Sequence, residues 1–182
     1  HGVIFTDANT GAAVGDYEPI VRTPNGGTNW TCQSSGTTQA LRKVFFLDAN
    51  VGWAVGDSGT ILHTTDAGTH WTSQSAGTTY GLVGLAFTDA NNGTVVGDVG
   101  TILRTPNGGV TWTSQSSGWR NDLCDVSFTD ANTGTAVGYG GTILHTTSGG
   151  ATWTSQSSVT SERLLGVSFS DANTGTVVGW TG

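Results

Sequence analysis

The first residue that could do chemistry is Asp66, which lies in the polar corner TTDAGTHW beside a Gly and a Trp. An acidic side chain in such a corner could be a catalytic acid or part of a binding site. The same corner returns three times along the chain, where Asn25, Asn107 and Ser148 replace the acid. A catalytic acid would not tolerate Asn in its place, whereas short side chains that accept hydrogen bonds from turn amides are interchangeable. We therefore expect all four corners to be structural.

Five further carboxylates belong to DAN triplets, at Asp7, Asp48, Asp89, Asp130 and Asp171. A ring of carboxylates could bind Ca²⁺, which prefers oxygen ligands. However, the motif contains no second carboxylate, and Asp followed by Asn and Gly is typical of a turn whose amides bond to the Asx side chain. We expect turns at these positions, and we expect neither a metal site nor a cofactor.

A basic residue occupies one position of each unit, namely Arg22, His63, Arg104 and His145. Together these side chains could bind an acidic peptide or another carboxylate. Two of them are His, which is mostly neutral at pH 7, and the chain carries a net charge of −7. The alternative, which we favour, is a strand residue whose stem packs between neighbouring elements while its head stays solvated.

No constellation of residues in the sequence is typical of a catalytic centre. A glycoside hydrolase needs two opposed carboxylates, but Asp16, Asp57 and Asp98 stand at equivalent positions of a repeat, which indicates a structural role. The GYGG at Gly138 does not join a strand to a helix, so it does not predict a phosphate-binding loop. We therefore expect a protein that is not an enzyme, with no catalytic residues.

An internal repeat of 41 residues places all these candidates. The Phe before each DAN triplet is found at Phe5, Phe46, Phe87, Phe128 and Phe169. A period of about 40 to 45 residues is typical of β-propeller blades or of helical repeats. In one unit, segments rich in β-branched and aromatic residues lie at 126–128, 135–137, 142–145 and 152–156. Because no stretch has helical periodicity, the pattern predicts an all-β fold, a β-propeller of four-stranded antiparallel blades.

The repeat also predicts the domain organisation. We expect a single propeller over residues 1–182, with blades at about 1–41, 42–82, 83–123 and 124–164 and the first half of a fifth blade at 165–182. A ring closes when its last blade is completed by strands of the first, which these ends cannot do. We therefore expect part of a larger ring, in which either the chain continues beyond Gly182 or the exposed edge pairs with another chain.

The pattern F-x-D-A-N-x-G-x-x-V-G-x-x-G-T-I-L-x-T-x-x-G-G-x-T-W covers essentially the whole chain. It resembles the BNR and Asp-box propellers, in particular the repeats of the Ycf48 (HCF136-like) photosystem II assembly factor family and similar repeats in secreted bacterial proteins. The resemblance implies structural Asp-box turns at Asn25, Asp66, Asn107 and Ser148, followed by Trp30, Trp71, Trp112 and Trp153. We expect each Trp ring to pack between blades. The same corner occurs in sialidases, xyloglucanases and non-enzymatic scaffolds, so the resemblance predicts the fold rather than the function.

Two links of each unit vary while the DAN turns and the corners stay constant. In a four-stranded meander the variable links lie at the opposite end from the constant turns, and we call that end the link face. Its variable residues are Tyr17, Glu18, Arg42, Lys43, Tyr80, Trp119, Arg120, Asp122, Tyr139, Glu162, Arg163 and Trp180. Exposed aromatic side chains mixed with charges are typical of protein or sugar contact sites. The alternative is that unconstrained loops drift, but we expect any binding site on this face.

Composition and charge exclude some partners. A net charge of −7 with only 6 Lys and Arg cannot supply the basic footprint of a nucleic-acid-binding protein. No apolar run approaches the ~20 residues of a membrane-spanning helix, so we expect no membrane insertion. Low charge, abundant Thr and Ser, and the absence of Met favour an extracellular or cell-surface location, with the periplasm or thylakoid lumen as alternatives. Sequons occur at Asn29 and Asn92, and we expect Cys32 and Cys124 to be unpaired.

The sequence therefore predicts a non-catalytic repeat scaffold that presents a rigid face to a protein or a polysaccharide. One alternative is a fragment of a propeller glycoside hydrolase of the sialidase or xyloglucanase type, with its catalytic residues outside this segment. Another alternative is a structural subunit that self-assembles through open blade edges.

Overall fold

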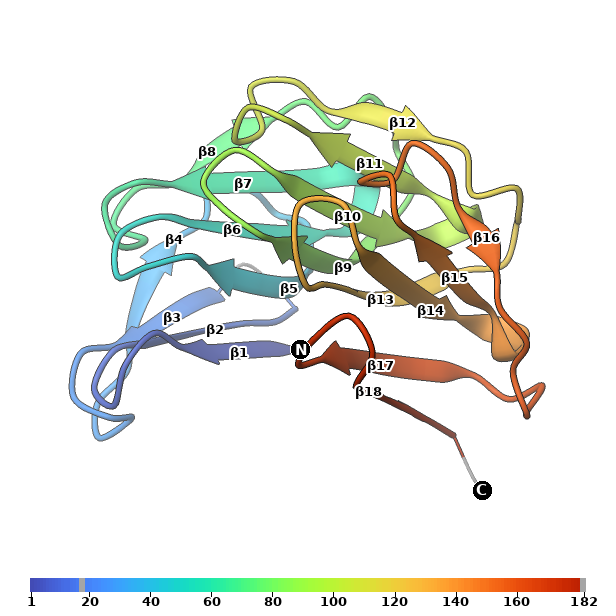
Figure 1. Ribbon diagram of the computed structural model, residues 1–182. Helices are drawn as coiled ribbons and strands as arrows, with labels where there is room; N and C mark the ends of the chain where they lie inside the picture. Colours follow the sequence, from blue (N-terminus) through green and yellow to red (C-terminus); the bar gives the residue numbers. More distant parts are fainter. Residues whose placement is uncertain (17–18, 181–182) are drawn as a thin grey trace. The chain divides into compact units, whose positions relative to one another are not determined.

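The computed structural model describes residues 1–16 and 19–180, and the chain is all-β apart from single 3-10 turns (Figure 1). In these described residues, four sheets have four antiparallel strands each, and one sheet has two strands. Within each sheet the strands lie side by side in chain order, which is the meander of a propeller blade. The fold class predicted from the repeat is confirmed, and we number the sheets as blades 1 to 5.

The strands are short and recur with the period of the sequence. Blade 1 has β1 (Gly2–Phe5), β2 (Gly11–Val14), β3 (Pro19–Thr23) and β4 (Thr31–Ser34). Blade 2 has β5 (Leu41–Phe46), β6 (Gly52–Gly56), β7 (Thr60–Thr64) and β8 (Thr72–Gln74). Blade 3 has β9 (Leu82–Phe87), β10 (Gly93–Gly97), β11 (Ile102–Thr105) and β12 (Thr113–Gln115). Blade 4 has β13 (Leu123–Phe128), β14 (Gly134–Gly138), β15 (Ile143–Thr146) and β16 (Thr154–Ser155), and blade 5 has β17 (Leu164–Phe169) and β18 (Gly175–Gly179).

The second and third strands of blades 2, 3 and 4 are joined by 3-10 turns. These turns are η1 (Asp57–Gly59), η2 (Asp98–Gly100) and η3 (Tyr139–Gly141). The middle residue of each turn has a left-handed backbone, although it is Ser58 in η1 and Val99 in η2. The turns therefore keep one backbone shape while their side chains differ.

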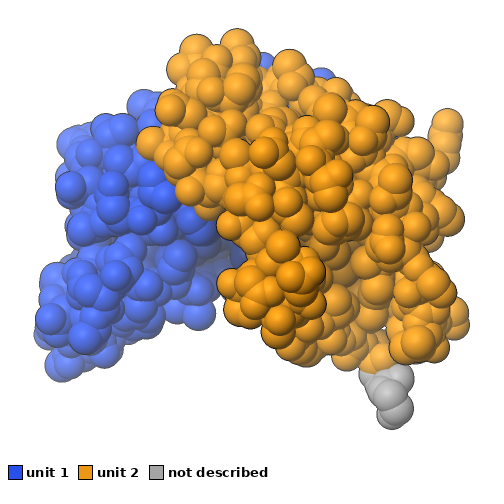
Figure 2. Space-filling model, viewed as in Figure 1, with its two compact units in different colours: residues 1–81 blue, residues 82–182 orange. Residues whose placement is uncertain are grey.

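The chain forms two compact units, one of residues 1–81 and one of residues 82–182 (Figure 2). In the first unit, β1 and β2 of blade 1 pack against β5 of blade 2. In the second unit, β13 of blade 4 packs against β9 and β10 of blade 3 and against β17 of blade 5. The same packing of first strands on first strands is thus found in both units.

Apolar residues of the first three strands of the blades form the cores. The first unit buries a cluster of Ala12, Val14, Ile20, Leu41, Val44, Phe46, Ala54 and Leu62. The second unit buries a cluster of Val96, Ile102, Leu123, Val126, Ala136 and Leu144. All five residues of β6, β10 and β14 are buried, whereas the fourth strands, with the sequence Thr-Ser-Gln in β8 and β12, are largely exposed. Polar outer strands discourage pairing with other chains at the blade edge.

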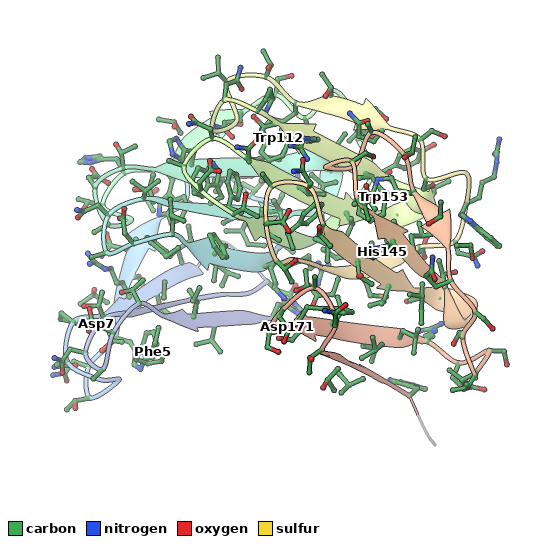
Figure 3. The ribbon with its side chains drawn as sticks, viewed as in Figure 1. Phe5, Asp7, Trp112, His145, Trp153 and Asp171 are labelled. Atoms are coloured by element: carbon green, nitrogen blue, oxygen red, sulfur yellow. The ribbon has the colours of Figure 1, made fainter. Side chains whose placement is uncertain are left out.

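The DAN turns are closed by their carboxylates, as expected. In blade 1, Asp7 Oδ1 accepts hydrogen bonds from the amides of Asn9 (2.7 Å) and Thr10 (2.8 Å). The other four DAN carboxylates, including Asp171 at the end of β17 (Figure 3), accept the same pair of amide bonds. These bonds lower the pKa of the carboxyl groups other than Asp89 below its usual value, and for Asp89 the bond from the Asn92 side chain lowers the pKa most, followed by the same amides.

Each corner is organised around a buried Thr that the sequence analysis did not single out. In blade 2, Thr64 Oγ1 accepts a hydrogen bond from the amide of Gly68 (2.9 Å) and donates one to Asp66 Oδ1 (2.9 Å). Asp66 Oδ1 also accepts a bond from the amide of His70 (2.9 Å). Blades 1, 3 and 4 repeat this arrangement with Thr23, Thr105 and Thr146. A buried hydroxyl needs such partners, because leaving it unpaired costs free energy.

The corner and the DAN turn of a blade are also bonded to each other. The amide of Ala67 in the corner donates to the carbonyl of Asn50 in the DAN turn (2.8 Å), and the equivalent bond occurs in blades 1, 3 and 4. The two constant turns therefore lie at the same end of each blade, as the meander predicts.

Each corner Trp contacts an aromatic ring of its own blade. The rings of Phe46 and Trp71 meet edge to face, with centroids 5.9 Å apart, and the Trp residues of blades 1, 3 and 4 meet Phe5, Phe87 and Phe128 in the same way. We expected the Trp ring to pack between blades, but its aromatic partner is the Phe that ends the first strand of its own blade. The reason is that the corner folds back over the DAN turn, which begins directly after that Phe.

The carboxylate of Asp66 makes unfolding of the first unit dependent on pH. Bonds from the backbone amide and then the ring of His70 lower its pKa to about 2. A lowered pKa in the folded state contributes stability above the usual pKa of 3.8, and this contribution is lost as the pH falls through about 2. The variant Asp66→Asn keeps a hydrogen-bond acceptor, as blade 1 does with Asn25. We expect this variant to lose less thermal stability than the parent protein as the pH falls from 4 to 2.

Circular dichroism melts of both proteins between pH 2 and pH 7 at constant ionic strength check this expectation. The reciprocal control is Asn107→Asp, because a carboxylate there would accept the amide of Thr111 and should add acid sensitivity. Parallel melting curves for the parent and Asp66→Asn across this pH range would contradict the assignment.

Candidate functional site

The link face of the second unit is held together by hydrogen bonds between turns and links. The amide of Tyr139 in η3 donates to the carbonyl of Asp122 (2.9 Å), and the Asn121 side chain donates to the carbonyl of Tyr139 (3.2 Å). On the other side of η3, the amide of Gly141 donates to the carbonyl of Glu162 (2.8 Å). The links 119–122 and 160–163 are therefore both bonded to the turn that carries Tyr139.

Close backbone packing makes this face rigid. Gly141 has a φ of 67°, and a Cβ at this position would collide with the carbonyl oxygen of Thr160. The amide of Trp180 donates to the carbonyl of Arg163 (2.9 Å), and the amide of Val99 donates to Asp122 Oδ1 (2.9 Å). Residues from η2, η3, both links and the end of β18 thus share one connected framework.

Large aromatic and basic side chains project from this framework. Trp119 is 46% exposed and Trp180 is 62% exposed, while Arg120 and Arg163 are also exposed. The Arg163 guanidinium carbon lies 4.0 Å from the centroid of the Tyr139 ring. We call this set of residues, Trp119, Arg120, Asn121, Tyr139, Arg163 and Trp180, the aromatic–arginine patch. Sequence comparison of the repeats found all of them except Asn121, whose signal was only its place in a variable link.

The link face of the first unit has a different character. Arg42 donates two hydrogen bonds to Asp57, at 2.8 and 2.7 Å, and one to Asp16 at 3.2 Å, so its guanidinium is occupied. Tyr80 is 50% exposed and borders an open hollow of about 620 Å³ lined by Gly59 and residues 74–80. Lys43 is half-buried in β5. Tyr17 and Glu18, which we also proposed for this face, lie outside the described residues.

The basic side chains of the third strands pack within or between blades. Arg104 reaches from blade 3 to blade 4, where its guanidinium donates to the carbonyls of Ala131 (3.4 Å) and Gly149, and it also donates to Asn92 Oδ1 (3.3 Å). These bonds join the DAN turn and the corner of the next blade, so Arg104 acts as a clamp between blades. Asn92 is occupied on its other side as well, because its amide donates to Asp89.

The two His side chains contact residues of their own blades. The His63 ring stacks on Trp53 with centroids 4.8 Å apart, and burial lowers its pKa below the usual value. His145, on the third strand of blade 4 (Figure 3), lies 3.2 Å from Thr135 Oγ1 through its Nδ1. Neither ring lies on the link face with the aromatic–arginine patch.

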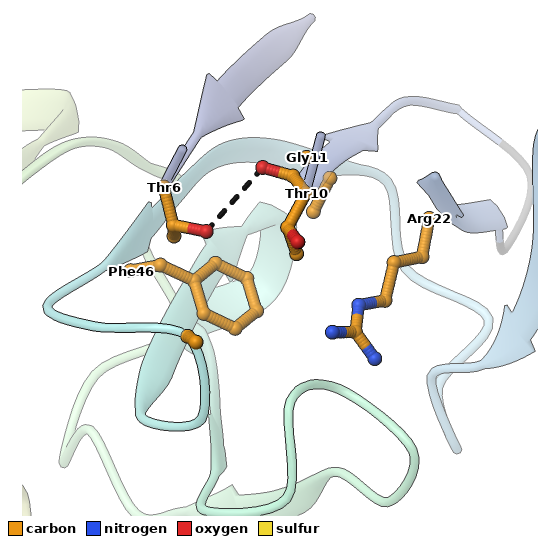
Figure 4. A pocket seen from close by; sticks show the side chains of 7 residues that line it. Thr6, Thr10, Gly11, Arg22 and Phe46 are labelled. Atoms are coloured by element: carbon orange, nitrogen blue, oxygen red, sulfur yellow. Dashed lines mark hydrogen bonds between the residues drawn. The ribbon is translucent and has the colours of Figure 1, made fainter. Parts of the chain in front are cut away.

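Arg22 is equivalent to Arg104 by sequence but not by contact. It lines a small cavity of about 10 Å³ with Thr10, Phe46 and Ala49, among others (Figure 4). Among residues 1–16 and 19–180, none accepts a hydrogen bond from its guanidinium. The corner of blade 2 has Ala67 where the corner of blade 4 has Gly149, and a Cβ at Gly149 would lie 2.5 Å from Arg104 Nη1. The methyl group of Ala67 thus explains why the clamp is open in the first unit.

Other candidate chemistry is limited in the part of the chain that the structure describes. No three His, Cys, Asp or Glu side chains there are arranged to hold a metal ion. Cys32 and Cys124 are free, and burial followed by the negative charge of Asp122 raises the pKa of Cys124 to about 11, which disfavours a nucleophilic thiolate at neutral pH. No described helix has the length and hydropathy of a membrane span.

Comparison with known proteins confirms the resemblance carried by the repeats. Residues 1–79 match the family model described as photosynthesis system II assembly factor YCF48. No curated protein matches the sequence. The chain is therefore Ycf48-like in its propeller repeats.

Solved structures confirm the fold. The structure described as YCF48 bound to D1 peptide matches with a TM-score of 0.72 and 22% identity, over 92% of this chain and 56% of that chain. YCF48 from Cyanidioschyzon merolae matches with a TM-score of 0.55 and 16% identity, over 98% and 92% of the two chains. An ancestral GH74 enzyme matches with a TM-score of 0.69 and 18% identity, over 83% of this chain and 23% of that enzyme. The chain thus spans just over half of the first of these structures, and its likeness extends to both an assembly factor and an enzyme.

Closing and opening the clamp should change stability in opposite directions. Gly149→Ala places a methyl group against Arg104 and forces Ala into a φ of 62°, which should cost about 2 kcal/mol in the free energy of unfolding. Ala67→Gly relieves a φ of 63° and lets Arg22 reach the corner, which should stabilise the protein by about 1 kcal/mol.

Urea denaturation followed by Trp fluorescence measures both effects. The matched control is Gly118→Ala, since Gly118 has a φ of 72° but an added Cβ would meet open space. This variant should lower the free energy of unfolding by only about 1 kcal/mol, from backbone strain. If Gly149→Ala lowers the free energy of unfolding by no more than this control does, the clamp does not contribute to stability.

Proposed function

We propose that this chain is a non-catalytic scaffold that binds a protein segment on the link face of its second unit. The observation that carries the proposal is the aromatic–arginine patch, in which Trp119, Arg163 and Trp180 project from a hydrogen-bonded framework around Tyr139. Trp, Tyr and Arg are enriched among the residues that dominate the binding energy of protein interfaces, and Trp and Tyr bury large areas at low cost in conformational entropy. A rigid framework lowers the cost of binding further, because little ordering remains to be done.

The comparisons support a protein partner. The YCF48 structure that shares this fold is described as bound to a D1 peptide, and the family model that matches residues 1–79 is that of an assembly factor. On the same basis we propose an extracytoplasmic location for this chain, in the thylakoid lumen. A polysaccharide ligand, a cell-surface location and self-assembly through the edge of β18 remain alternative predictions.

The contacts of the carboxylates support a non-catalytic role over the hydrolase alternative. The DAN carboxylates accept backbone amides, Asp16 and Asp57 are paired with Arg42, and Asp122 accepts the amide of Val99. A hydrolase needs one carboxyl group free to donate a proton and a second one facing it across the substrate. Carboxylates committed to turns and ion pairs do not provide such a pair.

A random peptide library displayed on phage tests the proposal with the whole chain as bait. We expect selected peptides to bind with micromolar affinity and to lose at least about tenfold in affinity for the variant Trp119→Ala/Trp180→Ala, because two exposed aromatic anchors are removed. The control is Val110→Ala, since Val110 is 82% exposed at the opposite, corner end of blade 3.

Isothermal titration calorimetry of synthetic peptides gives the affinities, and circular dichroism shows that each variant is folded. Recovery of no peptide, or of peptides that bind the double variant as tightly as the parent, would contradict the proposed function.

A further inference from the structure

One side of blade 1 presents apolar residues to solvent. Val3 and Phe5 (Figure 3) alternate along β1 with Ile4, which packs against the core of the first unit, so they project from the opposite side of the sheet. Both are exposed, Val3 at 65%. At the same repeat positions of blade 2, Val44 and Phe46 are buried in that core. We call Val3 and Phe5 the blade 1 surface.

Blade 5 also has an open side. Val178 of β18 is 58% exposed, and Ser168 and Thr176 are exposed as well. The strand register places these three residues on one side of the sheet, because Ser168 pairs with Thr176 and Gly166 pairs with Val178. We call Ser168, Thr176 and Val178 the blade 5 surface.

The contact between blades 4 and 5 shows what such a surface binds. Blade 4 turns the same three residue types toward blade 5, at Ser127, Thr135 and Val137. Val137 is 0% exposed in a cluster with Val167 of blade 5, and Phe169 packs against this cluster. Ser127 Oγ accepts a hydrogen bond from the amide of Phe169 (3.2 Å). A side with Ser, Thr and Val therefore binds a first strand that carries Val and Phe.

The two open surfaces reproduce both halves of this contact. Val3 and Phe5 occupy the repeat positions of Val167 and Phe169 and have the same residue types. The positions of Val178 and Val3 also meet within the first unit, where Val14 and Val44 share one buried cluster. The chain thus carries two different surfaces that match each other, and both leave apolar side chains in water, which is typical of an interaction site.

We propose that the blade 5 surface of one copy of this chain binds the blade 1 surface of a second copy, in a head-to-tail contact that repeats the packing of blade 5 on blade 4. Val178 packs on Val3, and Ser168 Oγ accepts the amide of Phe5. Because the two surfaces differ, each pair of copies keeps one surface of each kind open, so association continues into a string of copies or closes into a ring. The inference does not depend on the proposed function.

The contact between copies is weaker than the contact that it repeats. Gly166 of blade 5 stands where blade 4 has Asp125, whose Oδ2 accepts the amide of Val167 (3.3 Å). Ile143 of β15 packs against the cluster between blades 4 and 5, and the described part of blade 5 has only its first two strands. We therefore expect reversible association, as is usual for small interfaces.

Sedimentation velocity of the purified chain over a range of concentrations tests the proposal. We expect the sedimentation coefficient of the parent protein to rise with concentration. Val3→Lys and Val178→Glu each place a charge in the contact, and each should weaken association at least about tenfold, because burying an unpaired charge is costly. Both residues are exposed in the single chain, so the variants should fold, which circular dichroism checks. The matched control is Val110→Lys at the exposed corner of blade 3, which should associate like the parent.

Mixing the two variants separates a head-to-tail contact from other kinds of association. The Val3→Lys protein keeps an intact blade 5 surface, and the Val178→Glu protein keeps an intact blade 1 surface. Neither should associate alone, whereas an equimolar mixture can form one parental contact and should associate again. A contact between two identical surfaces would survive in one of the single variants.

Three results would overturn the proposal. Parent protein that stays monomeric at every concentration would mean that the two surfaces do not bind a second copy. Variants that associate like the parent, or a mixture that does not restore association, would place any contact elsewhere. The protein from its natural source distinguishes a second copy from further blades: an intact mass above that of 182 residues, with monomers at every concentration, would assign both surfaces to blades of the same chain.

Discussion

The bond between the corner and the DAN turn is the constraint on which the rest of each blade depends. In blade 2 the amide of Ala67 reaches the carbonyl of Asn50, and the hydroxyl of the buried Thr64 holds the corner in the shape that allows it. Because this network satisfies the buried polar groups locally, the four strands of blade 2 can be only three to six residues long and still hold their register. The network also packs the corner Trp onto the Phe that ends the first strand.

One consequence is that the two ends of a blade are under different constraints. At the corner end one side chain of each turn accepts an amide of the same turn, so this position changes only between short acceptors such as Asp66 and Asn107. At the link end the turns keep one backbone shape with different side chains, as the left-handed Ser58 and Val99 of equivalent turns show. Side chains there can change from Asp57 to Tyr139 without a change of fold, which frees the link face for recognition.

The sequence predicted the sheets, their order and the common end of the constant turns, because these depend on local pattern and period. Its errors concern strand ends and contacts between side chains that lie far apart in the sequence. The fourth strand of blade 4 was expected at 152–156, but it spans only Thr154–Ser155, since an edge strand with one partner has little to hold it. Arg22 and Arg104 share the motif RTPNGG, yet only Arg104 closes a clamp. That difference depends on Ala67 and Gly149, 45 residues further along, which no local pattern includes.

The charged side chains of the second unit are distributed unevenly between the two ends of its blades. At the corner end of the second unit, Asp89, Asp130 and Asp171 stay ionised at any pH above their lowered pKa values. Arg104, the basic residue near them, has its guanidinium committed to backbone carbonyls and Asn92. The exposed cations of this unit, Arg120 and Arg163, lie at the opposite end. The carboxylates that close the turns therefore keep the corner end of this unit negative, whereas the link face, where we propose that a partner binds, carries these two Arg side chains beside Asp122 and Glu162.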